Sequence, residues 1–270
     1  MRKFGKISFT LILFFTFCGL NVNAQKIIER TELSIFSAAG AKPPMDEVCR
    51  KFEAQYGSNV KINYAGGGEA LSQMMLSKSG DIYIAPEQGF IESAKEKQVI
   101  DPQTIKILGY MIPVIAVKKG NPKNINILAD LIKPGIRVAI ARPETTLTGK
   151  YALEIFQKAG LAKEIEENIT TQTARPDQLL TMLILDQADA GISWHFYQTL
   201  TPDQIEIIYL SPRQITGVGK MQIALSTFSK DRKLAQAFID FAVSAQVKAI
   251  FQKYGYMVDI EGVKKYYPEL

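Results

Sequence analysis

Three consecutive glycines, Gly66–Gly68, are the first residues whose type and spacing could do chemistry. They stand between a strand-like run at 60–64 and a helix-like run at 69–77. The start of a helix presents backbone N–H groups without intrahelical partners and the positive end of the helix dipole. Glycines at that point would let an anion approach the backbone and accept hydrogen bonds from those groups. The alternative is that they only close a turn, and the spacing leaves both interpretations open.

Similar junctions recur along the chain. Small residues at 37–41 follow the first strand-like run, Thr148 lies near the start of a helix-like stretch, and Arg175 and Pro176 open another. If several such helix starts meet in one cleft, they form an anion site from backbone dipoles. Arg175 would add bidentate pairing with a carboxylate or phosphate, or it is simply exposed to solvent.

The signals for catalysis and for metal binding are weak. His195 is the single histidine, and a lone histidine in an apolar stretch is more often packed than a general base. The chain has no G-x-S-x-G elbow, no H-E-x-x-H and no C-x-x-C spacing. The GGGEAL segment lacks the Gly-Lys-Ser/Thr ending of a P-loop. The sequence therefore predicts a binding protein and not an enzyme, with no cofactor and no directly bound metal.

Residues 1–24 have the layout of a secretory signal peptide. Basic residues precede an apolar run at 7–20, and a small-residue ending closes at Ala24. We expect cleavage after Ala24 and a periplasmic protein, with lipidation at Cys18 as the alternative. The mature chain would keep one cysteine, Cys49, which we expect to be a buried thiol.

Charge gives little support to a nucleic-acid partner. Removing residues 1–24 removes three basic residues and lowers the net charge from +5 to +2. Lysine and glutamate are interspersed along the rest of the chain, without the clustered basic face that nucleic-acid binding requires.

Strand-like and helix-like segments alternate over the first hundred residues, which predicts a parallel sheet covered by helices. A second alternating series begins near residue 113 and runs to residue 210. We expect an α/β protein of two lobes, with 25–112 and 214–270 in lobe 1 and 113–213 in lobe 2. A small ligand would bind in the cleft between them.

The sequence also resembles a known family. The stretch from SIFSAAGA through NYAGGGEALSQMMLSKSGDIYIAPEQGF resembles the N-terminal lobe of periplasmic molybdate-binding proteins. TGKYALEIFQKAG, QLLTMLILDQADAGISW and AQAFIDFAVSAQVKAIFQKYGY resemble later segments, so that the likeness spans 33–257. It implies a type II periplasmic-binding-protein fold, with a mixed sheet and flanking helices in each lobe. It also implies a monomeric subunit of an ABC importer that delivers molybdate or tungstate to an inner-membrane permease.

The resemblance implies a ligand-binding set as well. The family holds its oxyanion through two serines, backbone N–H groups of the second lobe and a tyrosine hydroxyl. The residues implied here, with their neighbours, are Ala39, Gly40, Gly66, Gly67, Thr148, Arg175 and Trp194.

Several of these positions depart from the family. Gly40 and Gly67 stand where the serines are expected, and neither has a hydroxyl. Pro176 stands at an amide donor position without an N–H, and Trp194 replaces the tyrosine with an indole N–H. Each lost hydrogen bond is worth about 0.5–1.5 kcal/mol. Another anion (sulfate, phosphate or an organic carboxylate) and a ligand-sensing role therefore stay open; the residues that could compensate are Arg142, Thr145 and Arg175.

Overall fold

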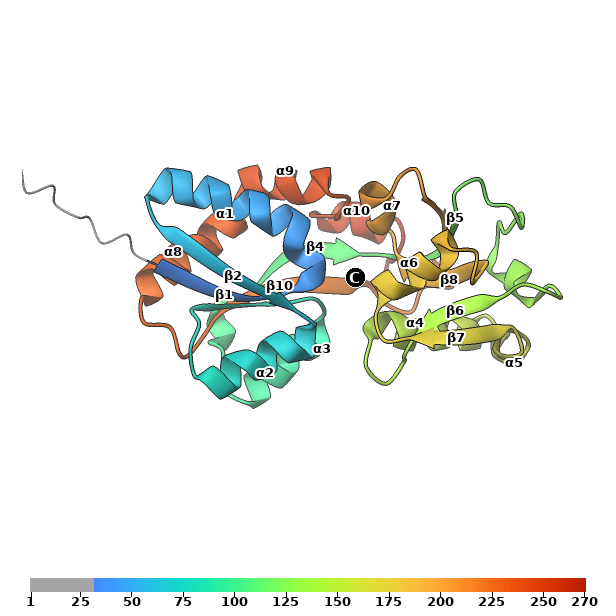
Figure 1. Ribbon diagram of the computed structural model, residues 1–270, viewed down its shortest axis with the longest axis horizontal. Helices are drawn as coiled ribbons and strands as arrows, with labels where there is room; N and C mark the ends of the chain where they lie inside the picture. The colour runs from blue at the N-terminus through green and yellow to red at the C-terminus, as the bar shows by residue number, and fades with distance from the viewer. Residues whose placement is uncertain (1–31) are drawn as a thin grey trace, which may run out of the picture.

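The structure is a computed structural model that describes residues 32–270. Two lobes lie side by side, each built on a five-stranded mixed sheet with helices packed against it (Figure 1). The predicted two-lobed α/β fold is therefore confirmed. The expected signal peptide at 1–24, its cleavage after Ala24 and the alternative at Cys18 lie outside the described residues.

The sheet of the first lobe has the strand order β2-β1-β3-β10-β4. Its strands are β1 (Glu32–Ala38), β2 (Asn59–Ala65), β3 (Ile82–Ala85), β4 (Lys106–Met111) and β10 (Gly219–Leu225). The expected parallel pairing holds for β2, β1 and β3. β10, for which the sequence predicted no direction, runs antiparallel to both β3 and β4, so the sheet is mixed, as the family resemblance implied. β10 enters this sheet directly on its return from the second lobe, whereas β1–β3 are joined by crossover helices.

Helices cover the first sheet and bury its apolar residues. They are α1 (Lys42–Tyr56), α2 (Gly67–Ser77), α3 (Gln88–Glu96), α8 (Arg232–Ala242) and α9 (Ala245–Lys253), with the short η1 (Ala39–Ala41), η2 (Pro102–Thr104) and α10 (Ile260–Lys264). The Phe52 ring of α1 contacts Phe238 and Phe241 of α8 edge-on, at centroid distances of 4.8 and 5.5 Å. Cys49 is buried beside them, as predicted, and burial raises the pKa of its thiol to about 12.

The sheet of the second lobe has the strand order β7-β6-β8-β5-β9. Its strands are β5 (Pro113–Lys118), β6 (Val138–Ala141), β7 (Ile169–Thr173), β8 (Ala190–Trp194) and β9 (Ile205–Tyr209). β6 runs parallel to its neighbours, whereas β5 runs antiparallel to both β8 and β9. The helices around this sheet are η3 (Leu128–Ile132), α4 (Leu147–Lys158), α5 (Ala162–Glu166), α6 (Pro176–Ile184) and α7 (Tyr197–Leu200).

The chain passes from the first sheet to the second at Ile112, between β4 and β5, and returns between β9 and β10. Ile112 N donates a hydrogen bond to His195 Nδ1, and His195 N donates one to Ile112 O, both at 3.0 Å. His195 is buried, and burial lowers its pKa to about 4, which keeps the imidazole neutral. The lone histidine is thus packed in the interior, as predicted. Its hydrogen bonds with Ile112 hold one of the two chain segments that connect the lobes.

Within residues 32–270, no single helix combines the length and apolar composition that a membrane span needs. α8 and α9 meet the criterion only when joined, and they are bent by 60° at the break between them.

Candidate functional site

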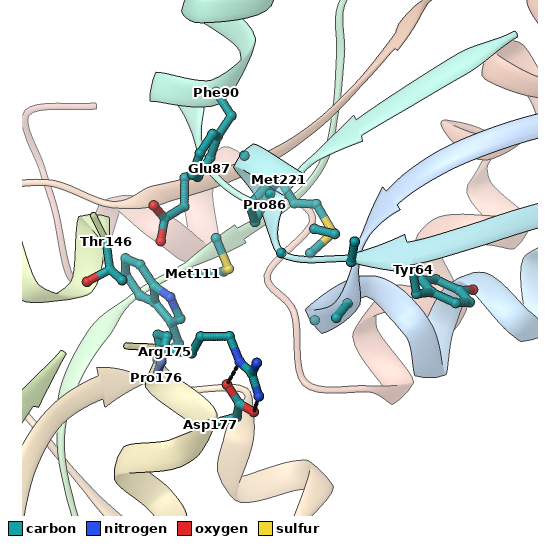
Figure 2. A pocket seen from close by; sticks show the side chains of 18 of the residues that line it. Tyr64, Pro86, Glu87, Phe90, Met111, Thr146, Arg175, Pro176, Asp177 and Met221 are labelled. Carbon is teal, nitrogen blue, oxygen red and sulfur yellow. Dashed lines mark hydrogen bonds and ion pairs between the residues drawn. The ribbon is translucent and has the colours of Figure 1, made fainter. Parts of the chain in front are cut away.

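A cleft of about 880 Å³ lies between the two lobes. Its first-lobe wall comes from the carboxyl ends of β1, β2 and β3 and from the segments that follow them. Its second-lobe wall comes from the loop before α4, the start of α6 and the end of β8 (Figure 2). Its size is within the usual range of small-molecule binding sites.

The cleft collects most of the residues that the sequence pointed to. Ala39, Gly40, Gly66, Gly67, Arg175 and Trp194 line it, as do Thr145 and Pro176. Arg142 is exposed and does not line it. All residues of the predicted set except one thus border one space, although their contact with a ligand stays a prediction.

Thr148 is the exception, because it is fully buried and is not among the lining residues. Thr146 lies at the cleft instead and caps α4, since its Oγ1 accepts a hydrogen bond from Gly149 N at 3.1 Å. A Cβ on Gly149 would stand 2.1 Å from Ala141 O, so α4 lies directly on the end of β6. Thr148, the second residue of α4, has its side chain in the interior, whereas Thr145 and Thr146 line the cleft.

The run of three glycines has a steric cause as well as a position at the cleft. A Cβ on Gly67 would stand 2.6 Å from Pro86 Cγ, and a Cβ on Gly68 would stand 3.3 Å from the Phe90 ring. Glycine is therefore what allows the start of α2 to pack against these two side chains. Gly66, the N-cap of α2, has only its neighbour Glu69 within 4 Å of such a Cβ. Both interpretations of the glycines have support: they permit close packing, and they bring the start of α2 to the cleft.

Arg175 is already paired with a carboxylate of its own chain. Its Nε donates to Asp177 Oδ1 at 3.0 Å and its Nη2 to Asp177 Oδ2 at 2.9 Å (Figure 2). This bidentate contact raises the pKa of Arg175 and lowers that of Asp177. An anion that used this guanidinium would have to compete with Asp177.

Glu87 is a cleft residue that the sequence did not single out. It is the N-cap of α3 and only 8% exposed, and its Oε2 accepts a hydrogen bond from Leu147 N of the other lobe at 2.9 Å. Burial raises the pKa of Glu87 to about 7. Its one sequence signal is an acidic residue two positions after the predicted strand at 81–85, which also suits an ordinary helix start.

The neighbour of Glu87 holds this part of the cleft in place. Gln88 Nε2 donates to Tyr151 Oη at 3.2 Å and to Val218 O at 3.3 Å, while Gln88 Oε1 accepts from Lys220 N at 3.1 Å. The start of α3 is therefore tied both to α4 and to the strand that returns from the second lobe.

Aromatic rings make up much of the remaining wall. Trp194 is 3% exposed, meets Tyr151 edge-on at a centroid distance of 6.1 Å, and its indole N–H makes no hydrogen bond within residues 32–270. Tyr256 stacks on Phe196 at 4.3 Å and donates its hydroxyl to Gly40 O at 3.0 Å. These rings give the cleft an apolar surface that a bare inorganic ion does not need.

In the part of the chain that the structure describes, no group of three or more His, Cys, Asp or Glu side chains could hold a metal ion.

Comparison with known proteins gives one family. The family of bacterial extracellular solute-binding proteins matches residues 33–257. The chain is 26% identical over 230 residues to a binding protein of Haemophilus influenzae, a match that covers 85% of this chain and 92% of that protein. It is 22% identical over 257 residues to the molybdate-binding protein ModA of Mycobacterium tuberculosis, covering 93% of this chain and 96% of that one.

Solved structures share the fold. The substrate-binding domain of a molybdenum ABC transporter from Clostridium difficile superimposes with a TM-score of 0.72 at 20% identity, covering 84% of this chain and 98% of that one. PEB3 from Campylobacter jejuni, solved with L-phospholactate bound, gives a TM-score of 0.71 at 20% identity and covers 83% of this chain and 99% of that one.

Proposed function

Because this chain belongs to the family of bacterial extracellular solute-binding proteins, we propose that it captures an oxyanion in the interlobe cleft and delivers it to the permease of an ABC importer. The family consists of binding proteins of transporters and not of enzymes. The protein works outside the cytoplasm, with the periplasm as the proposed compartment and a monomer as the proposed state. Molybdate and tungstate are the first candidates, since a relative at 22% identity is a molybdate-binding protein.

One observation carries this proposal. The start of α2 and the turn at Ala39–Gly40 border the same cleft, with Gly66 and Gly67 at its surface. The first N–H groups of α2 have no intrahelical partner, and the helix dipole favours a negative charge beside them. Closure of the lobes would remove water and strengthen each of these contacts.

An organic anion is the second candidate, and the size and lining of the cleft favour it. The volume of about 880 Å³ and the aromatic walls suit a ligand with a carbon skeleton better than a single tetrahedral ion. PEB3, which shares the fold, was solved with L-phospholactate, a molecule that carries both a phosphate and a carboxylate.

Thermal unfolding of the purified protein separates the two candidates. A ligand that binds only the folded state raises the unfolding midpoint by mass action. We expect a rise with molybdate or tungstate if the cleft takes inorganic oxyanions, and a rise confined to phosphate esters or carboxylates if it takes organic ones. Sulfate and phosphate complete the panel. A midpoint that no anion moves would contradict the proposal.

A further inference from the structure

The carboxylate of Glu87 occupies a position that an anionic ligand would otherwise use. Leu147 is the first residue of α4, and its N–H is one of the groups that a helix start leaves without an intrahelical partner. Glu87 Oε2 accepts a hydrogen bond from this N–H at 2.9 Å, and Thr146 Oγ1 accepts one from Gly149 N at 3.1 Å. The chain itself therefore supplies acceptors for two of the first three N–H groups of α4.

The second oxygen of Glu87 has no such partner. Glu87 is 8% exposed and lines the cleft, yet its Oε1 accepts no hydrogen bond from residues 32–270. This oxygen is not one of the fully buried polar atoms that lack a partner, so it is accessible from the cleft, and among the donors that could reach it a charged one gives the stronger bond. In Figure 2 the Glu87 carboxylate points toward Thr146 across the cleft. Above the pKa of about 7, where Glu87 is ionised, a ligand in the cleft can meet it only as a donor, because a second acceptor beside the carboxylate would be repelled.

Most of the other charged residues in the cleft are acidic, like Glu87. Of the residues that line it, four are acidic and one is basic, and the basic residue, Arg175, is paired with Asp177. The acidic residues are Glu69, Glu87, Glu144 and Asp177. An excess of carboxylates around an anion weakens its binding unless the ligand carries a positive group as well. Aromatic rings such as Trp194 and Tyr256 would add to the attraction of a cation.

We propose that Glu87 is the specificity-determining residue of this cleft, and that it selects an organic anion that also carries an ammonium group. This inference rests on the proposed function. The anionic group of the ligand would lie at the start of α2, and its ammonium group would donate to Glu87. Anions that only accept hydrogen bonds, molybdate and sulfate among them, are the ligands that Glu87 disfavours.

Matched pairs of ligands test the inference by calorimetry at pH 8. O-phosphoethanolamine is compared with ethyl phosphate, and β-alanine with propionate, so that each pair differs chiefly by an ammonium group; molybdate is added as an inorganic oxyanion. We expect the wild-type protein to prefer the amino member of at least one pair by about ten-fold or more, which is 1.4 kcal/mol. In Glu87→Gln this preference should fall at least five-fold, while affinity for the ligand without the ammonium group rises.

Two variants act as controls. Glu92→Gln removes a carboxylate from the exposed face of the same helix and should leave every ratio unchanged. Glu87→Asp retains the charge on a shorter side chain and should retain part of the preference for the ammonium group. Unfolding midpoints show which variants are folded.

The outcomes separate the inference from the function on which it rests. Binding of molybdate, or of both members of a pair equally, would overturn the role of Glu87 and leave the oxyanion function standing. Unchanged ratios in Glu87→Gln would do the same. If neither the wild type nor any variant binds a ligand of the panel, the role of Glu87 and the oxyanion-binding function are both overturned.

Discussion

Ile112 and His195 are joined by two hydrogen bonds of 3.0 Å at the point where the chain leaves the first sheet for the second: Ile112 N donates to His195 Nδ1, and His195 N donates to Ile112 O. The bond from Ile112 N requires a lone pair on His195 Nδ1, so the imidazole must stay unprotonated at that nitrogen. The geometry of this crossing and the protonation of the ring are thus coupled.

His195 should therefore titrate near pH 4 in the folded protein, compared with 6.5 for an ordinary histidine. As pH falls from 6.5 to 4, the unfolded chain binds the proton before the folded protein does. The free energy of unfolding therefore decreases by about 3 kcal/mol over this range. Since His195 is the single histidine, proton NMR of an untagged sample follows it directly. A titration midpoint at 6 or above would contradict the burial that we describe.

Glu87 should have the opposite effect on stability. Its pKa rises from 4.5 to about 7 because the charged carboxylate is buried, so the folded state takes up the proton first as pH falls. The carboxylate thus lowers stability above pH 7, and this penalty is relieved between pH 7 and 4.5. Relative to the wild type, Glu87→Gln should gain about 3 kcal/mol at pH 8, and this gain should vanish near pH 4.5. Urea unfolding at several pH values measures the difference; a difference that does not vary with pH would refute the assignment.

Serine substitution should have different effects at the two glycines that stand in the expected serine positions. Gly40→Ser meets no atom within 4 Å of the new Cβ and should leave the free energy of unfolding within about 0.5 kcal/mol of wild type. Gly67→Ser places its Cβ 2.6 Å from Pro86 Cγ and should cost about 1–3 kcal/mol. Chemical denaturation compares them directly, and equal stability of the two variants would show that Pro86 moves aside at no cost.

Removing the partner of Arg175 should strengthen anion binding. Asp177→Asn leaves the guanidinium without its bidentate carboxylate and removes one negative charge from the cleft. Because Arg175 and Asp177 are both exposed, we expect a modest gain of about three-fold in anion affinity, larger at low salt. Arg175→Gln is the matched control and should weaken binding. Anion affinity that is the same in both variants would place Arg175 outside the binding reaction.

Much of the fold follows from local patterns. The alternation of apolar strands with amphipathic helices placed β1 to β3 and α1 to α3 correctly, because most of these elements are long enough to show their period. The short helices α5, α7 and α10 did not stand out, since four or five residues cover little more than one turn. The antiparallel direction of β10 depends on where the chain returns, which no local pattern records.

The cleft was predictable in position and less so in chemistry. Glu87 looks like a residue at an ordinary helix start, and its partner Leu147 lies 60 residues away in the sequence. The contact of Gly67 with Pro86 likewise depends on how α2 meets the β3–α3 loop. Pairings of this kind are decided by packing between elements, so the residues could be found from the sequence while their partners could not.

The position of β10 between β3 and β4 also limits the order in which the protein can fold. The first lobe lacks an interior strand until residues 219–225 have left the ribosome, so most of the chain is made before that sheet can close. Strand pairing over so long a stretch of sequence is slow. Under the proposed export, this delay would keep the first lobe unfolded, and so able to pass through a membrane pore, until most of the chain has been made.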